Sequence, residues 1–368
     1  PDQSSAASDV YKRQIYISHS YAIPIGNPLE KEIIKRGFDV FWFSEEDEGK
    51  KALNSKNNSL ETIQDVIKYS PHILLAATDN APDFVKALKI QIFHGFLSHK
   101  RPENNFSEAH FRIRGFFDLY CTQGPSTTAE FTKLSKKLKH FEVVETGWSK
   151  MDPLFPLKKV KKKSCNPTVM IASTFTKRLS LAYNDGVFNK IKTMSKSGKF
   201  RFIAVLHPKI PKTVVDKWKQ LESEDFNYVS GTNLIPLFKE SDIMFSDTTS
   251  AIQEFLLQKK PVVTFKHTKN HPYLINVNEV EEIEKAIENA LKNPEDLIQK
   301  IVLFNKDLHP YCDGKSSVRV IDESINFLHK DKTYLKIKPL NLIRKFKIRK
   351  KLKKFTFKSY GKAFTLKR

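Results

Sequence analysis

Short apolar runs, separated by stretches with helical spacing, recur along most of the chain and restrict its fold more than any other feature. Runs such as residues 72–77 and 243–245 are too short for helices, and their side chains are apolar on both faces. This is typical of strands buried inside a parallel sheet. The alternation of such runs with helical stretches predicts an α/β fold whose parallel sheets are covered by helices on both faces.

The apolar runs form two series, which predict two domains of similar size. A lysine-rich run at residues 158–163, flanked by Pro153, Pro156 and Pro167, is typical of a linker. We therefore expect domains at residues 15–157 and 168–330, a linker at 158–167 and a separate tail at 331–368. Each domain would be doubly wound and Rossmann-like, with ligands at the carboxyl ends of its strands. The expected strands are 15–18, 38–43, 72–77, 90–93, 119–121, 143–144, 169–172, 202–206, 228–229, 243–245 and 261–265, and the expected helices are 28–36, 59–69, 189–194, 213–221 and 249–257.

Both ends of the chain depart from this pattern. Residues 1–14 are polar and lack periodicity, so we expect a non-native leader outside the fold. Residues 331–368 contain 15 Lys and Arg against one acid, which supplies +14 of the formal net charge of +22. Such a tail attracts polyanions, whether nucleic acid, anionic lipid or a phosphate-rich polymer.

Apolar side chains are interspersed among the cations of this tail. Ile348, Leu352 and Phe355 would share one face of a continuous helix. The remaining apolar side chains would point elsewhere, namely Leu342, Ile343 and Phe346. The composition predicts a segment that lies on an anionic membrane surface, with a solvated charge run as the alternative.

The cysteines and the hydropathy restrict the cellular location. Cys121, Cys165 and Cys312 match no zinc or redox spacing, which favours a reducing, cytosolic environment. No apolar run approaches the roughly 18 to 20 residues of a membrane-spanning helix. We therefore expect a protein that is soluble or peripheral to a membrane.

The most informative polar segment follows the strand expected at residues 243–245. Small hydroxyl residues and one acid occupy the place where this strand ends and a helix begins, namely Ser246, Asp247, Thr248, Thr249 and Ser250. Unpaired N–H groups and the positive dipole end of a helix start make this segment a candidate phosphate site. Glu254, one turn later, is placed to accept from ribose hydroxyls. Helix capping by Asp247 or Thr248 is the alternative.

Two histidines also follow expected strands. His207 precedes Pro208, and an imidazolium there could neutralise phosphate charge. His94 precedes Gly95, which would let the chain turn sharply and let a ligand approach the imidazole. Histidine is suited to general-base catalysis near neutral pH. Taken singly, each histidine could instead be structural.

Taken together and in order, these segments resemble the CDP-glycerol glycerophosphotransferase family of teichoic-acid polymerases and primases, which has a GT-B fold. The family's Trp-His-Gly strand end is matched by Phe93-His94-Gly95, and its Lys-Pro-His-Pro-like element by Leu206-His207-Pro208. Its Asp-Tyr-Ser-Ser segment, followed by a helical acid and an aromatic, is matched by Asp247-Thr248-Thr249-Ser250 with Glu254 and Phe255.

Two further motifs extend the resemblance to roughly residues 94–319. A Gly-x-Pro-Arg-x-Asp turn near the domain junction is similar to the segment that contains Gly147, Lys150 and Asp152. The family's closing Asp-Gly-Lys-Ser-Ser-x-Arg stretch is similar to Asp313-Gly314-Lys315-Ser316-Ser317 with Arg319. The chain departs from the family at two places. His99 stands where the family has a lysine, although Lys100 follows one step later, and residues 173–177 differ from the family's Pro-Thr-Trp-Arg-Asp element. The identity of the transferred group is therefore left open.

The resemblance implies phosphoryl transfer between two Rossmann-like domains with an interdomain cleft. An acceptor hydroxyl on the first-domain side would attack the distal phosphorus of a CDP-alcohol held by the second domain, and CMP would leave. His94 would take the hydroxyl proton, while His207 and residues 246–250 would stabilise phosphate charge. No cofactor is required and no metal cage is expected, although Asp247 could recruit Mg²⁺. The acceptor would be lipid-linked or polymeric, at the cytoplasmic face of the membrane.

Two other classes of function remain open. The GT-B fold also hosts glycosyltransferases and nucleotide-sugar epimerases, which would act on a nucleotide sugar instead of a CDP-alcohol. A non-enzymatic polyanion binder would depend on the tail alone. No recognisable nucleic-acid-binding motif accompanies the tail, so nucleic acid is not the expected partner.

Overall fold

The structure, a computed structural model, describes residues 11–96, 111–158 and 166–366. Residue contacts divide the chain into two compact units. Unit 1 comprises Pro1–His94, Ile113–Asp152 and Asp313–Arg368, and unit 2 comprises Gly95–Arg112 and Pro153–Cys312. The predicted domains followed the chain in order, whereas unit 1 draws on three separate segments. The boundary predicted at residue 330 is therefore corrected, because the chain returns to unit 1 at Asp313.

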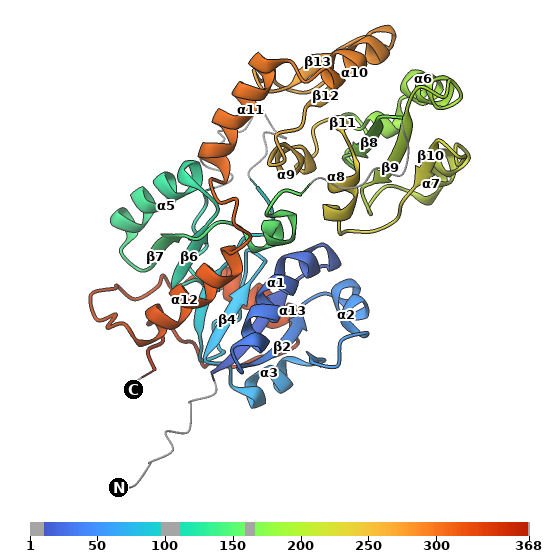
Figure 1. Ribbon diagram of the computed structural model, residues 1–368. Coiled ribbons are helices and arrows are strands. Elements are labelled where there is room, and N and C mark those ends of the chain that lie inside the picture. Colours follow the sequence, from blue (N-terminus) through green and yellow to red (C-terminus); the bar gives the residue numbers. More distant parts are fainter. Residues whose placement is uncertain (1–10, 97–110, 159–165, 367–368) are drawn as a thin grey trace, which may run out of the picture. The chain divides into compact units, whose positions relative to one another are not determined.

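Unit 1 contains a parallel sheet with the strand order β3-β2-β1-β4-β5-β6-β7 (Figure 1). The order reverses between β1 and β4, so this pair flanks the topological switch point of the sheet. All side chains of β4 are buried, as the apolar run predicted. The strands are β1 (Lys12–Ile17), β2 (Asp39–Ser44), β3 (Ser59–Leu60), β4 (Ile73–Ala76), β5 (Leu88–Gln91), β6 (Leu119–Thr122) and β7 (Glu142–Glu145).

Helices cover both faces of this sheet (Figure 1). They are α1 (Ile23–Lys35), α2 (Asp47–Leu53), α3 (Ile63–Tyr69), α5 (Pro125–Leu138), α12 (Ser316–His329) and α13 (Leu342–Lys351), with 3-10 turns η1 (Ser20–Ala22) and η2 (Ser149–Leu154). A glycine sets the approach of α1 to the sheet, because a Cβ at Gly26 would lie 2.2 Å from the ring of Trp42. Helix α12, from late in the sequence, packs beside α1.

The predicted leader is wrong for residues 11–14. Strand β1 begins at Lys12, and the side chains of Arg13 and Gln14 are fully buried. The ring of Tyr11 also contacts that of Phe38, with centroids 5.3 Å apart. These residues therefore belong to the fold, whereas residues 1–10 lie outside the described part of the chain.

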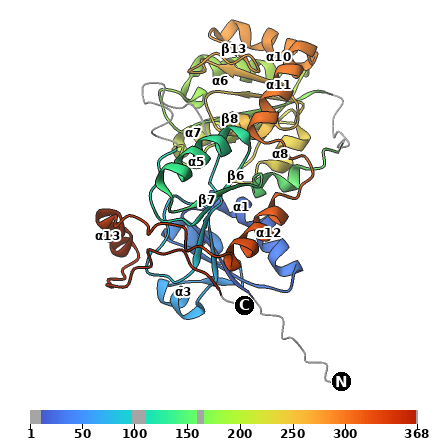
Figure 2. The same cartoon turned by 90° about the vertical axis from the view of Figure 1, so that its left-hand side faces the viewer.

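The basic tail is part of unit 1 and is neither a separate domain nor a solvated charge run. Lys338 pairs with Asp118 where both side chains are buried. The backbone N–H of Lys338 also donates to the carbonyl of Gly361 at 3.0 Å, which folds the tail back on itself. Helices α12 and α13 lie on opposite sides of the unit 1 strands (Figure 2). Carboxylates next to the strands of the sheet thus pair with several of the cations that the sequence suggested were free for other polyanions.

Unit 2 repeats the doubly wound plan with the strand order β10-β9-β8-β11-β12-β13, and all its strand pairs are parallel. Its switch point lies between β8 and β11. The strands are β8 (Thr168–Ser173), β9 (Arg201–Leu206), β10 (Phe226–Tyr228), β11 (Ile243–Ser246), β12 (Val262–Phe265) and β13 (Ile275–Val277). The helices are α6 (Asp185–Ser195), α7 (Lys212–Lys219), α8 (Ile235–Glu240), α9 (Ala251–Leu256), α10 (Ile283–Leu291) and α11 (Glu295–Leu308), with 3-10 turns η3 (Leu181–Tyr183) and η4 (Val280–Glu282).

The core of unit 2 lies between its sheet and these helices. Val169, Phe245 and Val263 of neighbouring strands are completely buried, and Trp218 of α7 joins them. The indole N–H of Trp218 donates to the carbonyl of Ala182 at 3.0 Å, which satisfies its polar atom inside the core. Across the described residues, no helix combines the length and the hydropathy that crossing a bilayer requires.

Candidate functional site

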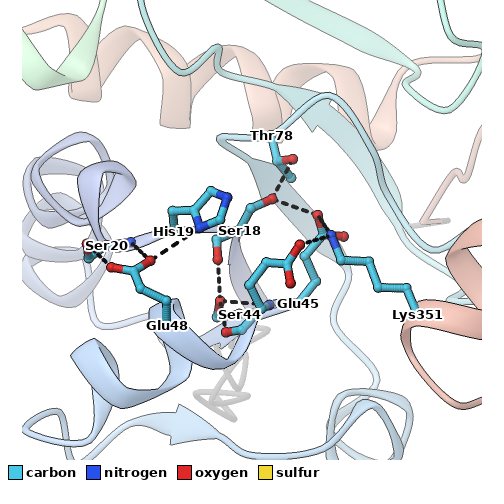
Figure 3. A network of polar contacts seen from close by, with 9 residues as sticks. Ser18, His19, Ser20, Ser44, Glu45, Glu48, Thr78 and Lys351 are labelled. Atoms are coloured by element: carbon cyan, nitrogen blue, oxygen red, sulfur yellow. Dashed lines mark hydrogen bonds and ion pairs between the residues drawn. The ribbon is translucent and has the colours of Figure 1, made fainter. Parts of the chain in front are cut away.

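In unit 1, a buried polar network lies at the switch point, where β1, β2 and β4 end (Figure 3). Ser18, directly after β1, donates to Glu45 at 2.6 Å and also lies 2.8 Å from the hydroxyl of Thr78. Tyr16 donates to the second oxygen of Glu45 at 2.8 Å. From the tail, Lys351 reaches the same carboxylate at 2.8 Å. Sequence reasoning missed this network because its members are 27 to more than 300 residues apart along the chain.

A second cluster lies beside this network on the start of η1 and on α2 (Figure 3). Glu48 accepts from the backbone N–H of Ser20 at 3.0 Å and from its hydroxyl. His19 Nδ1 lies 3.3 Å from the same carboxylate. These hydrogen bonds lower the pKa of Glu48 in spite of partial burial, which acts in the opposite direction. The edge of unit 1 therefore presents an ionised carboxylate and an imidazole to solvent.

His94 lies further along the same edge, after β5. Its Nδ1 is 3.8 Å from Asp79 Oδ1, and the other oxygen of Asp79 pairs with Arg114 at 2.9 Å. The side chain of His94 is 45% exposed, so a ligand can reach it. The backbone of Phe93 is left-handed, with φ 57°, and the chain then bends at His94 and Gly95. Positive φ at an aromatic residue is costly and is found mainly at functional sites.

In unit 2, Asp247 organises the loops at the switch point. Its carboxylate accepts from Ser173 Oγ at 2.6 Å and from the backbone N–H groups of Thr174, Leu181 and Thr248 at distances from 2.6 to 3.1 Å. The side chain is completely buried, and this burial raises the pKa of Asp247 against the lowering effect of the hydrogen bonds. Asp247 thus holds the loop after β8 against the loop after β11. Because its oxygens already accept these hydrogen bonds, the carboxylate of Asp247 is not positioned to contact a nucleotide or a Mg²⁺ ion in this structure.

The hydroxyl residues around Asp247 differ in exposure. Ser246 is buried and donates to the carbonyl of Ala172 at 2.6 Å. Thr248 is also buried, and its hydroxyl has no hydrogen-bond partner among the described residues. Thr249 and Ser250 are partly exposed, and within the described chain no acceptor is found for either backbone N–H. The predicted phosphate site therefore narrows to the amides of Thr249 and Ser250.

The helix after this segment is shorter than predicted. Helix α9 starts at Ala251, and Ser250 at its N-cap makes no side-chain capping bond. Glu254 is only 4% exposed. Its expected contact with a ribose stays a prediction.

His207 follows β9 and packs against Phe175, with ring centroids 4.6 Å apart. His207 Nδ1 accepts from the backbone N–H of Lys209 at 3.1 Å. A neutral imidazole that accepts at Nδ1 carries its proton on Nε2, so this nitrogen can donate to an anion. Lys209 also places its ammonium 5.4 Å from the ring of Phe175, which adds positive charge here.

A small hollow in unit 2 adds residues that the sequence reading missed. It is lined by Thr248, Thr249, Gln253, His267, His271 and Tyr273 among others. His271 stacks on Tyr273 at 4.9 Å, and burial lowers the pKa of His267, which favours its neutral form. The signal was the His-Thr-Lys-Asn-His-Pro-Tyr segment after β12, since side chains that follow a parallel strand lie at the ligand-binding edge.

The two late motifs meet within unit 1 and form a structural joint. Asp152 accepts from the backbone N–H groups of Ser316 and Ser317 at 2.8 and 2.7 Å, which caps the start of α12. Arg319 donates to the carbonyl of Thr146 at 2.8 Å and binds Asp313 through both terminal nitrogens. Gly147 has φ 77°, which favours glycine.

Lys150 and Lys315 also belong to this joint. Lys150 is buried with its ammonium 5.3 Å from the ring of Trp148. The backbone N–H of Lys315 donates to Asp313 at 3.0 Å. The first motif thus lies where the chain leaves unit 1 and the second where it returns, and Asp152 joins the two.

The structure leaves one part of the predicted site as a prediction. His94 lies in unit 1, whereas His207 and residues 246–250 lie in unit 2, so their meeting in a common cleft stays a prediction. His99 and Lys100 lie outside the described residues. In the described ranges, no three His, Cys, Asp or Glu side chains are grouped as a metal ion would need.

Comparison with known proteins gives one sequence relative and many structural ones. No protein-family model matches the chain. A stretch of 135 residues, 37% of this chain, is 24% identical to the minor teichoic acid biosynthesis protein GgaB of Bacillus subtilis (strain 168). That stretch spans only 14% of the length of GgaB.

Similarity to solved structures extends over most of the chain. The wall teichoic acid polymerase TagF is similar with a TM-score of 0.62 at 12% identity, over 86% of this chain and 89% of TagF. A UDP-N-acetylglucosamine 2-epimerase has a TM-score of 0.56 at 14% identity, over 89% of this chain and 98% of that one. S. aureus MnaA, in a co-structure with UDP, has a TM-score of 0.59 at 12% identity, over 86% and 97%. The predicted GT-B type α/β fold is thereby confirmed, and so is the resemblance to teichoic-acid polymerases.

Proposed function

We propose that this chain is a transferase of cell-surface polymer synthesis. It moves a polyol phosphate, such as glycerol phosphate, from a CDP-alcohol to a hydroxyl of a lipid-linked or polymeric acceptor. The observation that carries the proposal is the pair of amides at Thr249 and Ser250, unpaired within the described chain and held at the switch point by the buried Asp247. The motif resemblance and the similarity to GgaB and TagF support it.

Donor binding follows from the geometry of the unit 2 edge. Backbone N–H groups that are fixed in direction and lack acceptors bind phosphate oxygens without reorganisation. His207 lies at the end of β9 on the same edge, and its Nε2 proton can donate to a second phosphate oxygen. All these donors are amides, hydroxyls or an imidazole, so we propose that no dedicated cofactor is required. Asp247 would have to release its loop hydrogen bonds to bind Mg²⁺.

Acceptor activation is the role we propose for His94. Asp79 lies on the Nδ1 side of the imidazole, which leaves Nε2 as the nitrogen that takes the acceptor proton. As the acceptor oxygen bonds to the distal phosphorus, the bond from this phosphorus to the bridging oxygen breaks and CMP leaves. The carboxylate of Asp79 then stabilises the imidazolium, and Arg114 keeps that carboxylate in place.

One solved TagF structure is that of a histidine-to-asparagine variant soaked with CDPG, which favours a CDP-activated donor. A nucleotide-sugar enzyme is the second candidate, because the 2-epimerase and the UDP co-structure have TM-scores close to that of TagF. The histidine and tyrosine rings beside Thr249 are of a kind that can stack on the base of either nucleotide. The polyanion-binder alternative loses support, because several tail cations pair with carboxylates of unit 1.

A donor panel separates these functions. The full chain is incubated with CDP-glycerol, CDP-ribitol, UDP-N-acetylglucosamine and UDP-glucose, and nucleotide release is followed by chromatography. CMP release from a CDP-alcohol, with no change in the UDP-sugars, is the expected result. Conversion of a UDP-sugar alone would reject the CDP-alcohol proposal in favour of the nucleotide-sugar class.

Two variants assign the roles within the site. His94→Ala is expected to lower turnover by about 10² to 10⁴-fold while donor affinity, measured by calorimetry, stays within a few fold. Thr249→Ala with Ser250→Ala is expected to weaken donor binding by about tenfold, because the loop loses its hydroxyls and its fixed geometry. The matched control is Thr193→Ala with Ser197→Ala, which changes two exposed hydroxyls at the end of α6. Unchanged donor affinity in the Thr249 and Ser250 variant would show that their hydroxyls do not contact the donor, and would leave only their backbone N–H groups as candidate ligands.

A further inference from the structure

Helix α13 in the tail turns the cations of Lys345 and Arg349 toward the protein and leaves most of its apolar side chains exposed. Arg349 binds Asp83 through two nitrogens at 2.7 and 3.0 Å, and Lys345 lies 3.8 Å from the same carboxylate. The apolar side chains of Leu342, Ile343 and Phe346 are 69%, 74% and 57% exposed. An ordinary surface helix has the opposite arrangement.

The exposed apolar side chains form one surface, which we call the α13 outer face. Leu342, Ile343 and Phe346 are spaced i, i+1 and i+4 and therefore share one side of the helix. Phe346 contacts Phe355 of the following segment, with ring centroids 6.2 Å apart. The remaining members flank these residues in sequence, and all are more than half exposed: Leu340, Phe355 and Phe357. Figure 2 shows α13 at the periphery of unit 1.

Ion pairs with buried carboxylates fix this orientation. Asp83 and Glu45 are nearly inaccessible, and they pair with Arg349 and Lys351 respectively. Turning α13 to bury its apolar side would leave both carboxylates without their cations. Removing one partner of a buried ion pair costs roughly 3 to 5 kcal/mol, so losing both cations would cost about 6 to 10 kcal/mol, which offsets the roughly 4.5 to 9 kcal/mol gained by hiding three apolar side chains. The outer face is therefore held in an exposed state by the fold.

The composition around the outer face indicates its partner. Lys347 and Lys350 lie on the same side of α13, and Lys353 follows the helix, all exposed. From residue 332 to the end of the chain there is no acidic residue. A hollow of about 780 Å³ lies between α13 and the rest of unit 1, since its lining includes Asn80 and the buried Ile348 as well as Leu342. On the outer face, apolar side chains flanked by cations match the interface of an anionic bilayer.

We propose that the α13 outer face docks on an anionic lipid bilayer. Leu342, Ile343 and Phe346 insert among the lipid chains, while Lys347 and Lys350 contact the phosphates. The inference deepens the proposed function, since a lipid-linked acceptor lies at such a surface, and it places the protein as a peripheral protein at the cytoplasmic face of the membrane. It also replaces the face expected from the sequence, because Ile348 is only 4% exposed and cannot insert.

Vesicle sedimentation of the full chain tests the proposal. The probes are vesicles of phosphatidylcholine alone and of phosphatidylcholine with phosphatidylglycerol in equal parts. The chain is expected to bind the anionic vesicles at least about tenfold more tightly. Leu342→Ser with Ile343→Ser and Phe346→Ser is expected to weaken this binding by about 100-fold. The matched control changes three exposed apolar residues elsewhere to serine, namely Ile34, Ile67 and Leu303, and should bind within about twofold of the parent.

Independent readouts separate the outcomes. Equal melting temperatures of the triple variant and the parent would show that a loss of vesicle binding is not a loss of folding. Unchanged vesicle binding by the triple variant would overturn the proposal. Equal weakening of vesicle binding in the triple variant and in the control would also overturn it. Tight binding of duplex RNA by both the parent and the triple variant would overturn it as well, because it would indicate a general polyanion-binding surface.

Self-association through the same face would appear as a parent dimer in size-exclusion chromatography without vesicles, and would likewise overturn the proposal. Hydrolysis of soluble CDP-glycerol is measured separately. Its failure would sink the proposed function but leave the vesicle result standing.

Discussion

Replacing Asp247 by asparagine is expected to destabilise unit 2 before it affects chemistry. Asp247 accepts four donors, from Ser173, Thr174, Leu181 and Thr248. An asparagine keeps one acceptor oxygen and turns an NH₂ group toward the remaining donors. Whichever way the amide is oriented, one or two N–H groups lose their partner and face another donor.

The magnitude follows from these contacts. A hydrogen bond to a charged group contributes about 1.5 to 3 kcal/mol, and a buried donor without a partner costs about 1 to 3 kcal/mol. Burial raises the pKa of Asp247, so part of this loss is regained when the buried charge is removed. We expect a net loss of about 2 to 4 kcal/mol in the unfolding free energy of unit 2.

Urea unfolding followed by tryptophan fluorescence measures this loss. Trp218 lies in unit 2, whereas Trp42 and Trp148 lie in unit 1, so replacing the latter two by phenylalanine isolates the unit 2 signal. Asp242→Asn, at the opposite end of β11, is the control and should cost about 1 kcal/mol. A loss below about 1 kcal/mol for Asp247→Asn, together with lost donor binding, would refute the reasoning, because Asp247 would then act on the ligand and not on the loops.

Three further predictions follow from single positions. Gly26→Ala should lower the free energy of unfolding by about 3 kcal/mol, because the new Cβ would lie 2.2 Å from Trp42 and 2.9 Å from Ile15. An unchanged melting temperature would contradict this packing. Gly95→Ala should leave the melting temperature unchanged, since apart from its chain neighbours no atom of the described residues lies within 4 Å of the new Cβ. It should lower turnover if a ligand approaches His94 there, and unchanged turnover would exclude a ligand at that position. Burial lowers the pKa of Lys89 from 10.5 to about 8, so between these pH values the unfolded chain binds a proton that the folded chain does not. As the pH rises from 8 to 10.5, the parent should therefore gain up to about 3 kcal/mol in unfolding free energy relative to Lys89→Met. Parallel curves of unfolding free energy against pH for the two proteins would contradict this.

The order of strands and helices could be predicted because it depends on local periodicity. The runs at residues 72–77 and 243–245 became β4 and β11, since buried parallel strands are apolar on both faces. Helix ends were less exact. The helix expected at 249–257 begins only at Ala251, because the Asp247 hydrogen bonds keep the preceding loop out of helical geometry.

What could not be predicted depends on pairs that are distant in sequence. Tail cations such as Lys338 and Arg349 read as a free charge run, yet their partners Asp118 and Asp83 lie more than 200 residues earlier. The same limit hid the role of Asp247, whose segment was predicted as the end of a strand that opens directly into a helix. The residues next to a carboxylate in the sequence do not show whether it binds a ligand or accepts hydrogen bonds from the backbone amides of a distant loop.

The three-segment construction of unit 1 has a consequence for how the protein is made. Unit 2 is built almost entirely from the continuous stretch Pro153–Cys312, whereas unit 1 needs α12 and the tail, which leave the ribosome after that stretch. Asp118, Asp83 and Glu45 have no cations from the tail until it emerges. The chain should therefore complete its second unit first, and until the tail follows, the earlier unit remains an open sheet that chaperones can recognise.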